Sequence, residues 1–291
     1  MSRRTFRIIS FGGLGDILLG TPTFRALKNR YPGCRVIVFC RGRHDREVYQ
    51  NNPNIDSIRT TSFVRNPVMF TCYYLRWAKF YLLDYPHYSP GIVFKKSATQ
   101  IIAEMTGLSI EKAKPEVFLT PAEDAWGKMQ LASFRNPVVI HITSLTSENQ
   151  HWPMQNWEEL IRTCPEYTFI QVGLSGEQPV AGAIDFRGTT TFRQAMAMIK
   201  NAVSFVGVVS AFAHATGAFD VPGVVLFGAS TPDVWGHANN INLYKALRCA
   251  PCVDHLLKSP CPYGQPCMTG ITVREVREAL NSQVGPRIIN A

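Results

Sequence analysis

The segment FGGLGDILLGTPTFRAL (residues 11–27) joins a glycine-rich turn to one acidic residue and a helical pattern. The apolar, β-branched run TFRIISF (5–11) leads into it and predicts a buried strand. Glycines at such a turn let the backbone approach a ligand that a Cβ atom would block. Asp16 follows the last glycine, so it either caps the helix or takes part in catalysis.

The next segments extend this turn into a βαβ unit. TPTFRALKNRYPG (21–33) has helical spacing with Pro22 in its first turn, and CRVIVFC (34–40) predicts another strand. Strand, helix and strand within about 35 residues indicate a parallel sheet with a right-handed crossover.

A second α/β series follows the segment SIEKAKPEVFLTPAED (109–124), which is typical of a linker leading into a helix. The series predicts strands at 136–143, 167–173, 204–210 and 221–228, and helices at 157–164, 192–202 and 211–219. We therefore predict an α/β fold of two Rossmann-like parallel-sheet domains facing a cleft, formed by residues 1–125 and 126–291. Ligands of such sheets bind at the carboxyl ends of the strands.

The composition is that of an ordinary globular protein, with 291 residues of which 46% are hydrophobic. The basic start, MSRRTFRIISFGG, has too short an apolar run for a signal peptide and predicts a first strand instead. The sequence contains no run of about 18 apolar residues, so it predicts no membrane span. We expect a cytoplasmic protein, with peripheral contact at the inner membrane surface left open.

The chain carries 30 Lys and Arg against 21 Asp and Glu, a net charge of +9. This excess favours an anionic partner, whether a phosphorylated ligand, an anionic lipid surface or nucleic acid. The alternative is a generally basic solvated surface, because the basic runs, MSRR and RGRHDR, are short.

Residues 55–95 are rich in aromatic side chains, which indicate either a core helix or a wall of an acceptor site. These side chains are Phe63, Phe70, Tyr73, Tyr74, Trp77, Phe80, Tyr81 and Tyr85.

The glycine turn has neither the GxGxxG spacing of dinucleotide-binding proteins nor the GK[ST] of a P-loop. In the second half, three segments each run from a strand into a loop rich in hydrogen-bond donors and then a helix: 141–161, 206–218 and 224–232. Such loops suit a pyrophosphate. Each has an ordinary alternative, since His214 could be a buried core histidine, but their recurrence favours a nucleotide diphosphate.

Four motifs occur in an order that resembles glycosyltransferase family 9, the ADP-heptose heptosyltransferases of lipopolysaccharide and autotransporter glycosylation. They are GGLGDILLGTPTFRALKNRYPG, HxxS…HWPxxNWEELI, SAFAHATGAFDVPGVVLFGASTP and CAPC…C…CMTGITVREV. The resemblance implies a GT-B fold whose first domain holds mainly the acceptor and whose second holds mainly the nucleotide sugar. It also implies an inverting sugar transfer that requires no metal for catalysis.

By this resemblance Asp16 matches the family's catalytic acid and would be the general base that takes the proton of the acceptor hydroxyl. Gly13 and Gly15 would let both sugars approach the backbone of the turn. The resemblance thus favours catalysis over helix capping as the role of Asp16.

The resemblance also implies the donor-binding residues. Thr143 and Ser144 match hydroxyls that contact the donor phosphates, and Glu177 matches an acid that binds the ribose or the base. The loop that grips the pyrophosphate and sugar corresponds to Ser210, Ala211, Phe212 and His214.

Two positions depart from the family pattern. Gln150 stands where the family usually has a lysine, and Val209 stands where it usually has an aspartate. Each lost charge-assisted contact typically costs about 1.5–3 kcal/mol. A different donor sugar, a replacement cation such as His151 or Arg187, or a catalytically decayed binding or scaffold protein would each explain both changes.

Of the eight cysteines, four lie in apolar or strand-like sequence and are expected in the core: Cys34, Cys40, Cys72 and Cys164. The other four, Cys249, Cys252, Cys261 and Cys267, have the spacing C-x2-C-x8-C-x5-C. Four such thiols can surround a structural zinc or iron ion, with His255 as an outside ligand, or they remain reduced thiols in a proline-rich loop. In the autotransporter branch of the family a similar cluster holds a structural iron.

The expected partners are therefore a nucleotide-diphosphate sugar and an acceptor. The positive charge suits an anionic glycan or glycolipid acceptor, and it also allows a protein or, less favoured, nucleic acid. A non-hydrolysing nucleotide-sugar epimerase would share the two-domain fold, but the HWP segment and the cysteine-rich tail speak against it.

Overall fold

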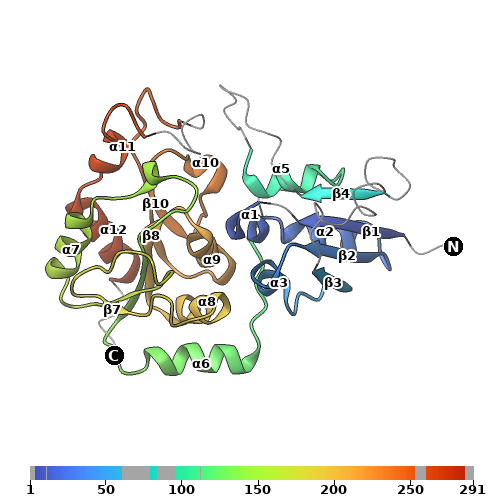
Figure 1. Cartoon of the computed structure of the whole chain (residues 1–291), viewed down its shortest axis with the longest axis horizontal. Helices are drawn as coiled ribbons and strands as arrows, with labels where there is room; N and C mark the ends of the chain where they lie inside the picture. Colours follow the sequence, from blue (N-terminus) through green and yellow to red (C-terminus); the bar gives the residue numbers. More distant parts are fainter. Residues whose placement is uncertain are drawn as a thin grey trace. The chain divides into compact units, whose positions relative to one another are not determined.

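The computed structural model describes residues 4–10, 12–60, 79–83, 96–111, 113–252 and 260–285. These residues form two compact units, of which unit 1 ends at Leu119 and unit 2 begins at Thr120. Each unit has its own parallel sheet with helices packed on it (Figure 1).

Unit 1 contains a sheet with the strand order β3-β2-β1-β4, in which all neighbouring strands are parallel. Its elements are β1 (Thr5–Ser10), α1 (Leu14–Leu19), α2 (Pro22–Arg30), β2 (Arg35–Cys40), α3 (Arg43–Tyr49), β3 (Ser57–Thr60), β4 (Phe80–Leu83) and α5 (Ala98–Glu104). Phe6, Ile8 and Ile9 of β1 are almost completely buried, as expected for a central strand covered on both faces. The predicted βαβ unit at the start of the chain is confirmed.

The helical region after β1 is divided into α1 and α2 at Thr21. The Thr21 hydroxyl donates to the Leu18 carbonyl at 2.7 Å and accepts from Glu116 N–H at 2.7 Å. The side chain thus terminates α1 and joins it to the strand-like segment before unit 2.

The aromatic segment predicted as a core helix or an acceptor wall lies largely outside the described residues. Its described aromatic side chains, Phe80 and Tyr81, lie in strand β4, and the Tyr81 ring packs 5.5 Å from the Phe6 ring. At these two positions a helix was therefore wrong, because the segment pairs with β1 in the sheet.

Unit 2 contains a parallel sheet with the order β10-β9-β8-β5-β6-β7. Its elements are α6 (Pro121–Leu131), β5 (Pro137–His141), η1 (Glu148–Gln150), α7 (Met154–Thr163), β6 (Thr168–Gln171), β7 (Ile184–Asp185), α8 (Phe192–Asn201), β8 (Ser204–Val208), α9 (Ala211–Phe219), β9 (Gly223–Phe227), α10 (Pro232–Trp235), β10 (Asn240–Tyr244), α11 (Pro266–Thr269) and α12 (Val273–Val284). The strand order reverses between β5 and β8. Such a switch point opens a crevice at the carboxyl ends of the strands.

Helices cover both faces of this sheet, with α7 and α12 on one side and α8 and α9 on the other (Figure 1). Val138 and Ile140 of β5 join the hydrophobic cluster beneath α7 and α12, where Trp152 and Trp157 meet edge to face at 5.0 Å. Trp152 also donates to the Ile271 carbonyl at 2.8 Å. The tryptophan of the HWP segment therefore belongs to the core of unit 2.

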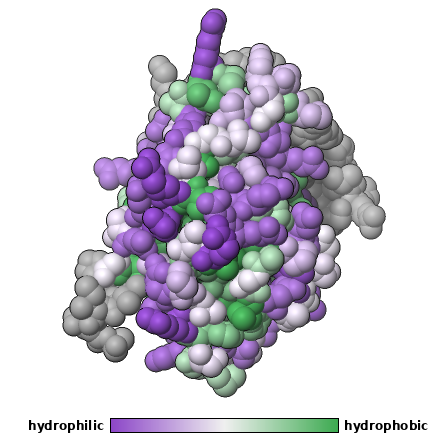
Figure 2. All heavy atoms as spheres, turned by 90° about the vertical axis from the view of Figure 1, so that its left-hand side faces the viewer, coloured by the Kyte–Doolittle hydropathy of each residue, from purple (hydrophilic) through white to green (hydrophobic). Residues whose placement is uncertain are grey.

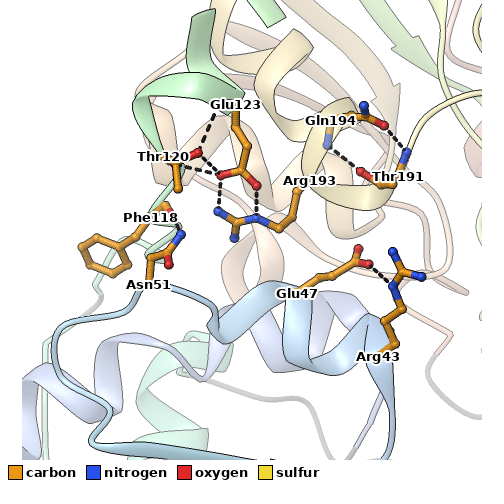
Figure 3. Close-up of polar contacts among 9 residues, drawn as sticks. All are labelled: Arg43, Glu47, Asn51, Phe118, Thr120, Glu123, Thr191, Arg193 and Gln194. Atoms are coloured by element: carbon orange, nitrogen blue, oxygen red, sulfur yellow. Dashed lines mark hydrogen bonds and ion pairs between the residues drawn. The ribbon is translucent and has the colours of Figure 1, made fainter. Parts of the chain in front are cut away.

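Helix α6 is fixed to α8 by the first residues of unit 2 (Figure 3). Thr120 and Glu123 cap the helix reciprocally: the Thr120 hydroxyl accepts from Glu123 N–H at 3.2 Å, and Glu123 accepts from Thr120 N–H at 2.7 Å. The same carboxylate pairs with Arg193 through two bonds of 2.5 and 2.7 Å. The Arg193 hydrogen bond lowers the pKa of Glu123 to about 2, since it outweighs the opposing effect of burial.

Figure 2 shows the side on which α7 is drawn in Figure 1; it is mostly hydrophilic, with hydrophobic side chains in small separate areas. Within the described ranges, no helix has both the length and the apolar sequence needed to cross a bilayer.

Candidate functional site

In unit 1, Asp16 lies in the first turn of α1, and its carboxylate folds back onto the glycine turn. Asp16 Oδ2 accepts a hydrogen bond from Gly13 N–H at 2.8 Å, so the side chain does cap the helix. Gly12 has φ = +92°, and a Cβ atom there would lie 2.8 Å from Asp16 Oδ2. Glycine at position 12 therefore permits both the left-handed turn and the placement of the carboxylate. Gly15 lies within α1.

Arg41, directly after β2, connects the second strand to this turn. Its guanidinium donates to the Gly12 carbonyl and pairs with Asp45 at 2.9 Å. The hydrogen bond that Arg41 donates to Asp45, with a smaller contribution from the charge of Asp16, raises the pKa of Arg41. The permanent positive charge of Arg41 thus lies near enough to interact electrostatically with Asp16, which the short basic run RGRHDR did not indicate.

In unit 2, polar side chains gather at the carboxyl end of β5, beside the switch point of the sheet. His141 ends the strand and is 7% exposed. Its Nδ1 lies 3.1 Å from Ser210 Oγ, and its Nε2 lies 3.4 Å from Thr143 Oγ1 and 3.6 Å from Glu177 Oε1. The structure thus brings together Thr143, Glu177 and Ser210, three of the predicted donor residues, around one histidine.

Glu177 lies in the loop after β6, with its side chain 8% exposed. Burial disfavours its charge, but the hydrogen bond and charge of His141, the Leu174 N–H and the Thr143 hydroxyl outweigh this, so that the pKa is lowered. Oε1 accepts from Leu174 N–H at 3.0 Å, whereas the buried Oε2 has no hydrogen-bond partner among the described residues. The site therefore holds a carboxylate with a lowered pKa and one buried oxygen whose hydrogen-bonding capacity is unused among the described residues.

Ser210, Ala211 and Phe212 form the start of α9, as predicted. The Ser210 hydroxyl caps the helix by accepting from Ala213 N–H at 3.4 Å. The Phe212 ring meets the His141 ring edge to face at 4.8 Å. The first backbone N–H groups of α9 thus lie next to the cluster around His141, as an anion site at a helix N-terminus requires.

His214 does not join this cluster. It is 3% exposed, and its Nδ1 lies 2.9 Å from His237 Nε2. Burial, with the neighbouring His237, lowers the pKa of His214 well below 6.5. In this structure the side chain is a partnered core histidine, the alternative that the sequence left open.

Gln150 is buried at 3% exposure and bridges two loops. Its Nε2 donates to Ser144 Oγ at 3.2 Å, and its Oε1 accepts from Ser230 Oγ at 2.7 Å. An uncharged amide therefore fixes the loop after β5 to the loop after β9. Val209, the other departure from the family pattern, is 9% exposed.

The two cations considered as replacements both have protein partners. Arg187 pairs with Asp185 at 2.7 Å and donates to the Glu177 backbone carbonyl. The His151 ring Nε2 lies 3.0 Å from Ser144 N. Arg187 thereby fixes the backbone of the Glu177 loop.

Three of the cysteines expected in the core are buried, namely Cys34, Cys40 and Cys164, while Cys72 lies outside the described residues. The four clustered thiols are free cysteines. Burial, together with the charges of the other three thiols, raises the pKa of Cys252 to about 11. The four are thus neighbours, but the described residues contain no group of three or more His, Cys, Asp or Glu side chains arranged to hold a metal ion. His255 lies outside the described ranges.

The sequence of this chain matches a known protein family. A family profile described as glycosyltransferase family 9 (heptosyltransferase) matches residues 86–261, more than half of the chain. The chain belongs to glycosyltransferase family 9. It is therefore a glycosyltransferase, as its motifs predicted.

Solved structures agree with family 9 in fold. E. coli ADP-heptose lipopolysaccharide heptosyltransferase II aligns with 98% of this chain and 99% of its own, at 14% identity and a TM-score of 0.74. The iron-containing dodecameric glycosyltransferase TibC from enterotoxigenic E. coli H10407 aligns with 98% of this chain and 77% of its own, at 17% identity and a TM-score of 0.75. E. coli heptosyltransferase WaaC with ADP aligns over 96% and 99%, at 13% identity and a TM-score of 0.61.

A search of curated proteins by sequence gave no match. The structural similarities show that the predicted GT-B-like α/β fold is correct.

Sequence reasoning gave no role to two residues of these clusters, His141 and Arg41. His141 lay within the predicted strand 136–143, and Arg41 lay in a short basic run. The strand-end position of His141 was a usable signal, because side chains there line the ligand edge of a parallel sheet.

Proposed function

We propose that this family 9 enzyme transfers a heptose from ADP-heptose to an acceptor hydroxyl, with Asp16 as the general base. Family membership carries the proposal. The names of structural neighbours support the donor: one is an ADP-heptose heptosyltransferase, and a second TibC structure is a complex with ADP-D-beta-D-heptose. Unit 1 supplies the base and mainly the acceptor site, and unit 2 mainly the donor site.

In the proposed reaction, the Asp16 carboxylate accepts the proton of the acceptor hydroxyl as that oxygen bonds to the anomeric carbon. The bond from the anomeric carbon to the diphosphate breaks at the same time, ADP leaves, and the anomeric configuration inverts. The backbone of the glycine turn, fixed by Asp16 and Arg41, keeps the carboxylate in place.

In the proposed donor site, Glu177 accepts hydroxyl hydrogen bonds from the ribose through Oε2, the buried oxygen that has no hydrogen-bond partner among the described residues. Thr143, Ser144 and the start of α9 surround the phosphates. Gln150 serves this site indirectly, because it fixes Ser144 rather than offering a charge to phosphate.

The test is calorimetric titration of the purified protein with ADP, GDP, UDP and CDP, followed by ADP-heptose, for the wild type and Asp16→Asn. We expect selective binding of ADP and ADP-heptose that is equal in both proteins. The transfer rate of Asp16→Asn should fall by about 100-fold or more, since general-base catalysis contributes that much.

Two results would contradict the proposal. A transfer rate that survives in Asp16→Asn would exclude Asp16 as the base. Failure of the wild type to bind any nucleotide would instead favour a decayed donor site in a binding or scaffold protein.

The acceptor is proposed as an anionic glycan or glycolipid, supported by the net charge of +9. A protein acceptor would be recognised by transfer of labelled sugar to polypeptide rather than to a lipid extract. Contact with an anionic membrane surface is proposed on the same charge and predicts co-sedimentation with anionic vesicles that high salt abolishes.

A structural metal at Cys249, Cys252, Cys261 and Cys267 also stays a proposal. Their mutual proximity and the iron-containing TibC support it, whereas the present arrangement of the described thiols does not fit a metal site. Elemental analysis of the purified protein decides it, with zinc or iron near one equivalent as the expected result.

A further inference from the structure

His141 is the polar centre of the unit 2 site, and the proposed function has given it no role. It is the last residue of β5, and its backbone is paired with Gly207 of β8. A Cβ atom at Gly207 would lie 2.7 Å from the His141 carbonyl oxygen, so the strands are closely packed at this point. The Phe212 ring covers the imidazole edge to face. The ring is therefore held by β8, by α9 and by its own strand.

The contacts of His141 determine which ring nitrogen carries the proton. Glu177 is ionised and can only accept, so we assign the ring proton to Nε2, which lies 3.6 Å from Glu177 Oε1 and 3.4 Å from Thr143 Oγ1. Nδ1 is then the acceptor and receives the Ser210 hydroxyl proton at 3.1 Å. Ser210 Oγ is meanwhile the acceptor for Ala213 N–H, which leaves its own proton for His141.

Glu177 needs such a partner because its loop makes room for the carboxylate without holding it fully. Gly173, with φ = +150°, would place a Cβ atom 2.4 Å from Glu177 Oε2. Leu174 N–H and His141 both contact Oε1, and Oε2 is left buried without a hydrogen-bond partner among the described residues. Because the two oxygens belong to one rigid carboxylate, the contacts to Oε1 also fix the direction of Oε2.

We propose that His141 is a positioning residue for donor recognition: its Nε2–H orients Glu177 so that Oε2 meets the ribose diol of the nucleotide, while its Nδ1 fixes the Ser210 cap beside the diphosphate. This inference rests on the proposed function, since it assumes a ribonucleoside diphosphate donor. One side chain, His141, would then connect the ribose contact at Glu177 with the diphosphate contact at Ser210.

The experiment compares calorimetric binding of ADP and 2′,3′-dideoxy-ADP, which lacks the diol. The proteins are the wild type, Glu177→Gln, His141→Asn and His141→Gln. Asparagine places an amide near the position of Nδ1, so it retains a partner for Ser210 but loses the contact with Glu177. Glutamine reaches the position of Nε2 and retains a donor for Glu177. Thermal unfolding of each variant reports on folding.

We expect the wild type to bind ADP about tenfold or more tightly than the dideoxy analogue, as a hydrogen bond to a charged group allows. Glu177→Gln and His141→Asn should each abolish most of this preference, and a protein that carries both substitutions should lose no more. His141→Gln should retain most of it. Rescue by glutamine and not by asparagine would not arise from a merely structural role.

The inference is overturned if His141→Asn keeps the diol preference that Glu177→Gln loses, or if His141→Gln loses as much as His141→Asn. A wild type that binds ADP without diol preference overturns the roles of Glu177 and His141 but leaves the ADP donor standing. A wild type that binds neither nucleotide overturns the donor assignment and this inference together.

Discussion

At the scale of single residues, position 12 in the glycine turn of unit 1 has to satisfy two structural requirements. Gly12 must adopt a positive φ, and it must leave space for the Asp16 carboxylate. Gly33 shares only the first demand, because φ is +76° and a Cβ atom there would meet nothing within 4 Å. The two glycines therefore allow backbone strain to be separated from disturbance of the carboxylate.

Replacing Gly33 by alanine should cost about 1 kcal/mol of unfolding free energy through strain alone and leave the transfer rate unchanged. Gly12→Ala should cost more and should also lower the transfer rate, because the new methyl group displaces Asp16. Denaturant unfolding and sugar-transfer assays measure both quantities. Equal transfer rates in the two variants would show that the placement of Asp16 does not depend on Gly12.

Asp16 and Glu177 could be singled out from motifs, since each acid lies in a short local pattern, and the roles assigned to them stay predictions. The role of Gln150 could not be predicted, because its partner Ser230 is 80 positions away. His141 and Ser210 are separated by 69 positions. Such contacts depend on strand order, which the sequence does not specify locally.

At the scale of elements, helices α6 and α8 are joined by two ion pairs of different character. Arg193 and Glu123 form a bidentate pair in which the arginine side chain is 5% exposed. Lys200 and Asp124 form a pair at 2.8 Å with both side chains more than a third exposed. The first lies in the interface, and the second is largely hydrated.

Arg193→Met should therefore destabilise unit 2 by about 2–4 kcal/mol, because the half-covered Glu123 loses its partner while still capping α6. Lys200→Met, on the same helix, should cost at most about 1 kcal/mol because the pair is exposed. Urea unfolding of both variants measures the difference. Similar losses would mean that the bidentate pair contributes no more than a surface one.

Most strands and the longer helices of the central region could be predicted, since β1, β2, β5, β8 and α8 have clear apolar patterns. Helix α3 was not predicted because its sequence, RHDREVY, is dominated by charged residues. One side of the helix is buried only through contacts with segments distant in the sequence. Tyr49 at its end, for example, donates to Ser10 of β1 at 2.7 Å.

At the scale of the whole molecule, buried titrating groups make stability depend on pH. Burial lowers the pKa of His214 below 6.5, so the unfolded chain binds a proton there that the folded chain does not. Stability conferred by a neutral His214 is present above pH 6.5 and is lost as the pH falls below it. Glu123 acts at lower pH: with a pKa of about 2, its contribution is present above pH 4.5 and is lost between 4.5 and 2.

The unfolding free energy should therefore decrease from pH 7 to pH 5, by at most about 1.4 kcal/mol per pH unit for this one histidine. Urea unfolding followed by tryptophan fluorescence measures it, since Trp152 and Trp157 lie in the core of unit 2. His214→Asn keeps a group near Nδ1 for His237 but does not titrate, so its profile should be flatter. An unchanged slope would assign the loss to other groups.

The two sheets of the described chain also share no strand, and their strands do not alternate along the sequence. During synthesis the ribosome delivers β1 to β4 and helix α5 before β5, at Pro137, has been made. The sheet of unit 1 can thus form before any strand of unit 2 exists to compete for pairing, since translation runs at about 5–20 residues per second.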